Sequence, residues 1–334
     1  MYMNIAYQPL LAVIFLLFIT TSCIREDDGN CGINVRFVYD YNILSANAFE
    51  DQVDQVTLYV FGEDGILVRQ YTENHTLLNN GFNIRLTDLK RGNYHFVAWA
   101  QSKHITSDQS FFSIPELKAG ASSIDELTYL MKREGASGFQ LHELNNFLVG
   151  MVDVVIDDNS SYIILNLKKV TNKIKVVILP YTPGGNLDVT DYEISIIDKM
   201  GNGHINYDYI TLPDNQITYL PYYKANLGPK DVDDLLPGEI DKAAVVEINT
   251  SRLIVENAPR LRIVDKRMRK EIVSMNLPWV FSLTEMENNK NWSLQEYLDR
   301  QDKYTIMLFF DDKTWMYTSL IINGWVVNIK DIDL

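Results

Sequence analysis

Residues 56–68 read VTLYVFGEDGILV, two apolar runs joined by the segment Gly62-Glu63-Asp64-Gly65. An Asp-Gly pair between two apolar runs is a strong signal for a β-hairpin, because both residues tolerate the backbone angles of a tight turn. The stretch therefore predicts two antiparallel strands joined by a tight turn.

Similar short patterns occupy most of the chain on both sides of the hairpin. In residues 34–41 the side chains of Val35, Phe37 and Tyr39 alternate with largely polar ones, as in a strand that buries one face. Further strands are expected at 82–86, 94–100, 151–156, 162–167, 172–179, 192–198, 243–248, 252–255, 261–264, 271–275, 304–310, 316–322 and 325–329. The dipeptide Asn323-Gly324 joins the last two strands as a two-residue hairpin loop.

Helical patterns are few. Ser293 and Glu296 form a capping box at the start of one short helix. Ser122 or Ser123 with Glu126 could cap another, although the residues that follow suit a strand equally well. Many short strands separated by turns indicate an all-β protein built from antiparallel sandwiches.

The length of the chain favours two domains of about 150 residues each. We place the boundary at the turn-forming cluster that follows residue 156, which gives an N-terminal domain over 33–157 and a C-terminal domain over 158–334. No clear internal repeat relates the two halves.

The N-terminus has the features of a lipoprotein signal. Leu10 to Ile19 is an unbroken apolar run, too short to cross a bilayer but of the length found in signal peptides. Thr20, Thr21 and Ser22 then precede Cys23, as small residues precede the acylated cysteine in a bacterial lipobox. We therefore expect a signal peptide over 1–22, lipidation of Cys23 and a short polar tether over 23–32.

Two alternatives remain open, because residues 1–22 contain no Lys or Arg and Thr20 stands where a lipobox more often has Leu. The first is ordinary secretion, with Cys23 free or disulfide-bonded to Cys31. The second is a transmembrane anchor.

The formal net charge of −14 excludes some classes of partner. Nucleic acid requires clustered Lys and Arg against its phosphates, so we expect no nucleic-acid binding. The acidity also disfavours adhesion to an anionic lipid surface. If Cys23 is acylated, Cys31 is left alone, and no disulfide framework or cysteine metal site can form.

No group of residues resembles a catalytic, cofactor or metal site. The five histidines lack ligand spacing, and His142-Glu143 fails as a zinc helix because Asn146 stands where the second histidine is needed. The acidic segments at 157–159 and 231–234 are interpreted as turns rather than as calcium-binding sites. We therefore expect no enzyme activity, no cofactor and no metal.

One basic cluster stands out in this acidic chain. It lies at the expected hairpin tip between the strands at 261–264 and 271–275, and could contact an acidic partner or lipid phosphates. The simpler interpretation is a solvated tip whose charges discourage edge-to-edge aggregation. Its members are Lys266, Arg267, Arg269 and Lys270.

Several stretches together resemble one known family, the fimbrillin-A-associated anchor proteins of the FimB type, found in surface fimbriae of Bacteroidota. These stretches are INVRFVYDY (33–41), TLYVFG (57–62), GNYHFVAW (92–99), TSRL (250–253), QEYLDR (295–300) and NGWV (323–326). The resemblance implies two transthyretin-like β-sandwich domains in tandem. It also implies an outer-membrane lipoprotein, surface-exposed at the base of a fimbria, that seats the shaft and limits its length.

The resemblance also implies the major fimbrial subunit, a fimbrillin, as the partner. Strand exchange would join the two, because an added strand pairs with an open sheet edge through its main chain. The alternative function is that of a surface glycan-binding lipoprotein of a polysaccharide-uptake system, which would need exposed, coplanar aromatic side chains.

Overall fold

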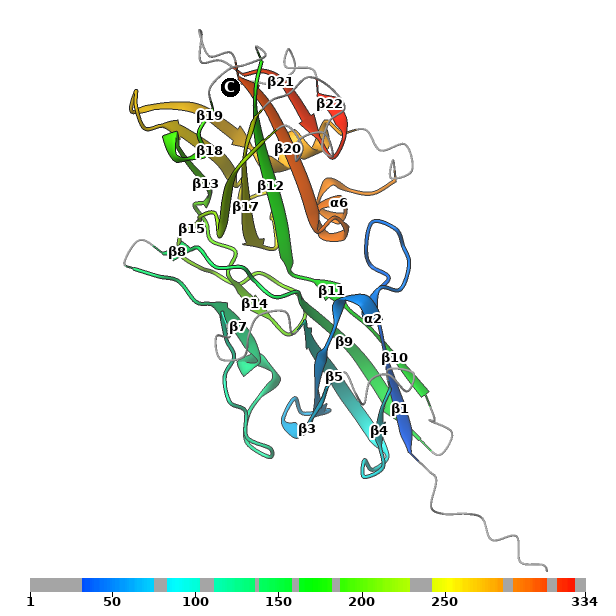
Figure 1. Cartoon of the computed structure of the whole chain (residues 1–334). Helices are drawn as coiled ribbons and strands as arrows, with labels where there is room; N and C mark the ends of the chain where they lie inside the picture. The colour runs from blue at the N-terminus through cyan, green and yellow to red at the C-terminus, as the bar shows by residue number, and fades with distance from the viewer. Residues whose placement is uncertain are drawn as a thin grey trace, which may run out of the picture.

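The computed structural model describes residues 32–74, 83–102, 111–135, 138–157, 162–181, 187–228, 242–284, 291–310 and 317–327. In Figure 1 strands run along the whole molecule, with the first strand at one end and the last two at the other. No helix within these ranges is both long enough and apolar enough to cross a membrane.

Two sheets face each other in the N-terminal half. The smaller has the order β10 (Tyr162–Asn166), β1 (Ile33–Val38) and β4 (Asn83–Leu86). The larger has the order β11 (Lys168–Lys169), β9 (Phe147–Ile156), β5 (Gly92–Gln101), β2 (Gln55–Gly62) and β3 (Leu67–Asn74). The short helix α2 (Phe49–Gln52) leads from the first sheet into the second.

Two larger sheets form the C-terminal half. One has the order β16 (Tyr223–Leu227), β17 (Ala243–Ser251), β12 (Thr171–Pro180), β20 (Lys303–Phe310), β21 (Tyr317–Ile322) and β22 (Trp325–Val327). The other has the order β19 (Lys270–Asn276), β18 (Arg260–Asp265), β13 (Tyr192–Asp198), β15 (Ile217–Tyr219) and β8 (Phe139–Gln140). In the described part of this half the helices are η2 (Val189–Asp191), α5 (Leu277–Ser282) and α6 (Leu294–Arg300).

The all-β fold class is confirmed, as are its main sequence signals. Strand β2 pairs with β3 across the Asp64-Gly65 turn, and Val35, Phe37 and Tyr39 are buried. Strands β21 and β22 form the final hairpin, with Asn323 and Gly324 both at positive φ as a two-residue loop requires.

Ser293 and Ser123 are both confirmed as N-caps, and the full capping box is present with Glu126, whereas the Glu296 carboxylate accepts a hydrogen bond from Arg300 Nε at 2.9 Å. Ser293 Oγ accepts the backbone N–H of Glu296 at the start of α6. The segment with two interpretations contains both elements, because Ser123 and Glu126 cap the 3-10 helix η1 (Ile124–Glu126) and β7 (Thr128–Met131) follows directly.

Some expectations from the sequence were wrong. Residues 252–255 form no strand, because the N–H of Val255 binds the Gln295 side chain at 2.9 Å instead of a neighbouring strand. Helix α5 was missed, although Asn276 at its N-cap and Pro278 in its first turn are recognisable signals. The pairs β1–β10, β12–β20 and β8–β15 are parallel, which no local pattern could indicate.

The two halves are joined by strand pairing as well as by the chain. In a fifth sheet, β14 (His204–Asn206) pairs with β7, which in turn pairs with β6 (Phe112–Ser113). Strand β8 adds to the C-terminal sheet through β15. Conversely, β10 and β11, which follow residue 157, pair with β1 and β9 of the N-terminal half. A domain boundary at 157 stays a prediction, whereas the hydrogen-bonded N-terminal sheets extend to Lys169.

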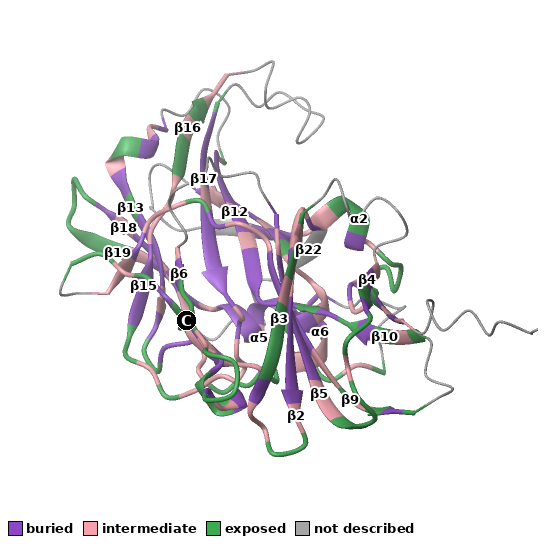
Figure 2. Cartoon of the chain, turned by 90° about the horizontal axis from the view of Figure 1, so that it is seen from below, coloured by how far each residue is buried: buried purple, intermediate pink, exposed green. Residues whose placement is uncertain are grey.

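The buried side chains follow the same arrangement (Figure 2). One apolar core lies between the two N-terminal sheets and includes Phe37, Phe49 and Phe96. A second core fills the C-terminal sandwich and continues to the opposite face of the five-stranded N-terminal sheet, where Trp99 and Phe147 belong to it. The halves therefore share a continuous core.

Gly150 in β9 is required by a close approach of two chain segments. A Cβ atom at this position would lie 2.1 Å from the carbonyl oxygen of Asn166 and 2.9 Å from the side chain of Leu165. Both neighbours lie at the end of β10, where the chain crosses β9 before it pairs as β11. Only glycine allows the chain to cross β9 at this distance.

We expect Gly150→Ala to lower the free energy of unfolding by about 1–3 kcal/mol, since a backbone oxygen cannot move aside as a side chain can. Chemical denaturation of the mature chain measures the change. Gly228→Ala is the matched control, because a Cβ there meets no atom within 4 Å. Equal effects of the two substitutions would contradict the close crossing.

Candidate functional site

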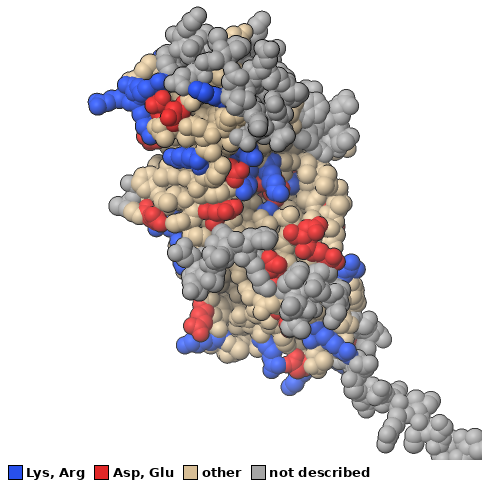
Figure 3. All heavy atoms as spheres, in the orientation of Figure 1, with Lys and Arg blue, Asp and Glu red and all other residues tan. Residues whose placement is uncertain are grey.

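The basic tip is formed by the turn between β18 and β19 and is partly used within the chain. Lys266 Nζ donates to the carbonyl oxygen of Thr190 at 2.7 Å, and the Arg267 guanidinium lies 3.3 Å from carboxylates of both Asp191 and Asp265. All four predicted residues are exposed, including Arg269 and Lys270. In Figure 3 basic side chains project at the upper left, where this hairpin ends in Figure 1.

Asp265 holds the tip in shape. Burial opposes ionisation of its carboxyl group, but the N–H groups of Met268 and Arg267 and the Arg267 guanidinium offset this, so its pKa lies below the usual value. Two of the four cations therefore help to fix the hairpin, and contact of Arg269 and Lys270 with a partner stays a prediction. The other predicted site residue, Cys23, lies outside the described residues.

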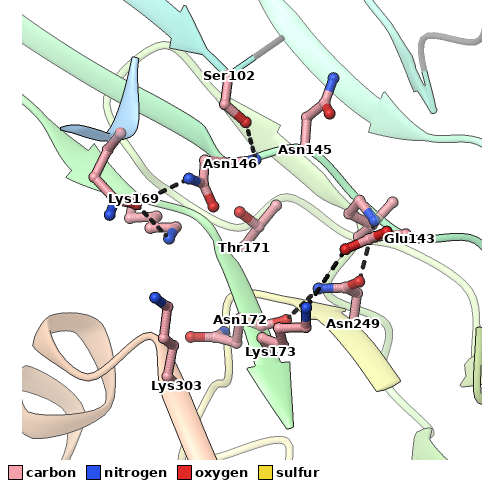
Figure 4. A pocket seen from close by; sticks show the side chains of 12 residues that line it. Ser102, Glu143, Asn145, Asn146, Lys169, Thr171, Asn172, Lys173, Asn249 and Lys303 are labelled. Carbon is pink, nitrogen blue, oxygen red and sulfur yellow. Dashed lines mark hydrogen bonds and ion pairs between the residues drawn. The ribbon is translucent and has the colours of Figure 1, made fainter. Parts of the chain in front are cut away.

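A polar pocket of about 210 Å³ lies where the two halves meet (Figure 4). It is smaller than the pockets of about 300–1,000 Å³ that usually hold organic ligands, and far more polar. Its walls come from α2, the end of β5, the segment before β9, and strands β11, β12, β17 and β20. The lining residues are Gln52, Ser102, Glu143, Leu144, Asn145, Asn146, Lys169, Thr171, Asn172, Lys173, Asn249 and Lys303.

Lys169 is the most enclosed charge in this pocket. Its side chain is only 4% exposed, and its ammonium group contacts the Asp302 carboxylate and Gln52 Oε1. Burial lowers the pKa of Lys169, because desolvation outweighs the attraction of Asp302. Lys169 follows β10 in the N-terminal half and Asp302 precedes β20 in the C-terminal half, so the pair joins the two halves.

Amide side chains tie the pocket walls together. Asn249 Oδ1 accepts the N–H of Leu144, and Asn249 Nδ2 donates to the carbonyl oxygen of Asn172, each at 3.1 Å. Asn146 Nδ2 donates to Gln52 Oε1 at 2.8 Å. Most of these groups are therefore used for structure. The pocket could not be predicted from local sequence patterns, because its residues are spread over about 250 positions of the chain.

A second polar cluster at the junction is built around Arg252. Its guanidinium binds both carboxylate oxygens of Asp299, at 2.8 and 2.7 Å, and lies 4.1 Å from the centre of the Tyr209 ring. Tyr209 in turn donates to the carbonyl oxygen of Lys169 at 3.0 Å. Burial opposes the charge on Arg252, but Asp299 and Tyr209 offset this and its pKa is raised.

Helix α6 adds a second contact between a guanidinium group and aromatic rings. The guanidinium of Arg300 lies 4.0 Å from the ring centre of Tyr41, a residue of the N-terminal half, and 4.5 Å from that of Trp292. Stacking of this kind adds about 0.5–1 kcal/mol at exposed sites and more where water is excluded. Arg300 of α6 therefore attaches the C-terminal sandwich to the loop after β1.

The histidines that the structure describes have separate partners. His95 binds Asp153 and His142 binds Glu134, each at 2.5 Å, whereas His204 Nδ1 lies 3.4 Å from a carbonyl oxygen. Over the described ranges, no three His, Cys, Asp or Glu side chains are grouped as a metal site would require. His75, His104 and the carboxylates of 231–234 lie outside those ranges.

Comparison with known proteins identifies the family. The model for the fimbrillin-A associated anchor proteins Mfa1 and Mfa2 matches residues 26–331, nearly the whole chain. The chain belongs to this family, which confirms the resemblance seen in the sequence. The family is of a structural, anchor or adhesin type and is not an enzyme family, and membership implies a cell-surface protein associated with a fimbrium and its fimbrial subunit.

Solved structures agree with this assignment. A Bacteroides thetaiotaomicron protein whose description proposes polysaccharide binding is 30% identical, with a TM-score of 0.76 over 90% of this chain and 99% of that one. A second protein of that organism, described as a proposed adhesin, is 26% identical, with a TM-score of 0.74 over 89% and 97%. The fimbrial anchor protein Mfa2 from Porphyromonas gingivalis is 19% identical and shares the fold, with a TM-score of 0.62 over 89% and 98%. No curated protein matches the chain.

We expect Arg252→Ala to lower the free energy of unfolding by about 3–5 kcal/mol, because it leaves the buried carboxylate of Asp299 without its partner. Chemical denaturation checks this. The exposed pair of Arg262 and Glu271 gives the matched control, since Arg262→Ala should cost at most about 1 kcal/mol. Arg252→Lys should recover only part of the loss, because an ammonium group cannot bind both oxygens in the same plane.

Proposed function

We propose that this chain is the lipid-anchored base subunit of a fimbria, held in the outer membrane through Cys23 and joined to the fimbrillin shaft by strand exchange. Membership of the anchor family from residue 26 onward carries the proposal, because the family match begins three residues after the lipobox cysteine. A subunit that is fixed in a membrane and pairs at one end only terminates a polymer, which limits its length.

The sheet edges support a role as acceptor of a strand. The last described strand, β22, is already paired with β21 in its own hairpin, so it is not free to be donated. Strand β3 lies at an edge of the five-stranded sheet, and most of its residues after Leu67 are exposed. An extended segment can pair with such an edge through its main chain.

The glycan-binding alternative receives less support. The aromatic residues with strongly exposed side chains in the described ranges are Tyr162, Tyr181 and Tyr223. They lie in β10, directly after β12 and in β16, and no two of these strands are neighbours in a sheet. A flat aromatic platform for a sugar ring is therefore absent from the described surface. The pocket at the junction is polar but has no aromatic wall.

Cys23→Ala should release the protein from the membrane fraction, because the two or more acyl chains needed for stable anchoring can no longer be attached. Cell fractionation with metabolic labelling by a fatty acid measures both effects. Cys31→Ala is the matched control and should keep the label and the membrane location. Retention of the Cys23→Ala protein in membranes would contradict lipid anchoring.

Attachment to the shaft is tested by affinity purification of the tagged chain from detergent-solubilised membranes. We expect a fimbrillin-like major subunit to co-purify, and we expect deletion of the gene to release fimbriae or change their length. Recovery of a TonB-linked transporter or glycan-handling proteins instead would favour the alternative function. Fimbriae of unchanged length and attachment in the deletion strain would rule out the base subunit.

A further inference from the structure

The outer face of the small sheet β10-β1-β4 carries several exposed side chains and has an unusual composition. Along β1 the inward side chains enter the core, so the alternate positions face outward. Strand pairing aligns these positions in rows, with Asn34 between Tyr162 and Arg85, and Arg36 between Ile164 and Asn83. Val38 and Asn166 complete the face.

This face combines apolar and cationic groups. Tyr162 is 48% and Ile164 is 51% exposed, and Arg36 and Arg85 are also exposed. None of the eight outward positions is Asp or Glu, although the chain has 44 acidic and 30 basic residues. Charges farther away than about 8 Å are largely screened at physiological salt. Arg36 and Arg85 are therefore the charged groups that a surface meets at the eight outward positions of this face.

The position of the sheet limits what can touch it. Strand β1 begins at Ile33, only ten residues after Cys23. An extended chain spans at most about 3.6 Å per residue, so a lipid on Cys23 would hold the start of β1 within about 36 Å of the bilayer. Figure 1 shows β1, β4 and β10 together at this end of the molecule, opposite the last two strands.

We propose that the outer face of β10-β1-β4 rests on the anionic headgroups of the membrane that holds the Cys23 lipid. The proposal depends on the lipid anchoring proposed above. Arginine suits this contact because its planar guanidinium binds phosphate through two parallel hydrogen bonds. Tyrosine also suits the membrane interface, because its ring can pack against acyl chains while its hydroxyl group stays among the headgroups.

Such a contact orients the body without anchoring it. Each cationic side chain near an anionic surface strengthens binding about fivefold, so two arginines contribute about 30-fold in total. That is far less than acyl chains contribute, and it is consistent with release of an unacylated protein on cell fractionation. While the lipid holds the face near the bilayer, this 30-fold strengthening favours the orientation in which the face contacts the headgroups.

The test supplies the tether artificially, so that it does not depend on natural acylation. The mature chain with Cys31→Ser receives a hexahistidine tag in place of Cys23 and is bound to vesicles through nickel-chelating lipids. An environment-sensitive fluorophore on Ile164→Cys reports contact with the bilayer. The matched probe is Met268→Cys, at a position of similar exposure on the distant basic tip.

We expect the probe at 164, but not at 268, to become brighter and blue-shifted on phosphatidylglycerol vesicles relative to phosphatidylcholine. Removing both charges in Arg36→Gln/Arg85→Gln should reduce the contact about 30-fold, and about 1 M salt should have a similar effect. Arg269→Gln/Lys270→Gln removes the same charge elsewhere and should leave the signal unchanged. Circular dichroism confirms folding of each variant.

A response at 268 instead of 164 would overturn the proposal and would assign the membrane contact to the basic tip. No response at either position would also overturn it and leave the face for a protein partner. Both results are independent of Cys23 acylation, so failure here is distinguishable from failure of the lipid anchor.

Discussion

The apolar core shared by the two halves is the constraint on which the rest of the structure depends. Trp99, Tyr129 and Phe147 pack edge-on or tilted around one another, with ring centres 5.0–6.5 Å apart. Tyr129 also places its hydroxyl group 2.8 Å from Ser251 Oγ of the C-terminal sandwich. Because these rings cover the second face of the five-stranded N-terminal sheet, neither half can move away without exposing them to water.

This arrangement explains why the junction also contains so many polar groups. Strands that cross from one half to the other bring loops, strand ends and helix α6 together, and their amide and charged groups must be satisfied once water is excluded. The buried pairs Lys169–Asp302 and Arg252–Asp299 and the asparagines of the pocket serve that purpose. Buried ion pairs add little net stability compared with apolar contacts, but they penalise other arrangements of the same segments.

A stiff junction suits a subunit at the base of a filament. If the chain is such a base subunit, as proposed, a hinge at the junction would let its two halves swing relative to each other under load. Several contacts act against such a hinge. They are the shared core, the strand pairs β7–β14 and β8–β15, the hydrogen bond from Tyr209 to Lys169, and the contact of Arg300 with the Tyr41 ring. A stiff junction is therefore consistent with membership of the anchor family, while attachment of a shaft to this chain rests on the proposed strand exchange.

Local sequence determined the strands, hairpins and caps. The Asp64-Gly65 and Asn323-Gly324 turns, the alternation of Val35, Phe37 and Tyr39, and the Ser293 cap depend on residues only a few positions apart, so their chemistry is visible in the chain itself. Combined motifs over 33–326 also indicated the family. Only the tertiary structure decided which strands pair, because the parallel neighbours β1 and β10 are more than 120 residues apart. For the same reason it alone showed that β10, although it follows the expected boundary, pairs within the N-terminal half. It also assembled the pocket from seven parts of the chain and brought Tyr162, Ile164, Arg36 and Arg85 onto one face.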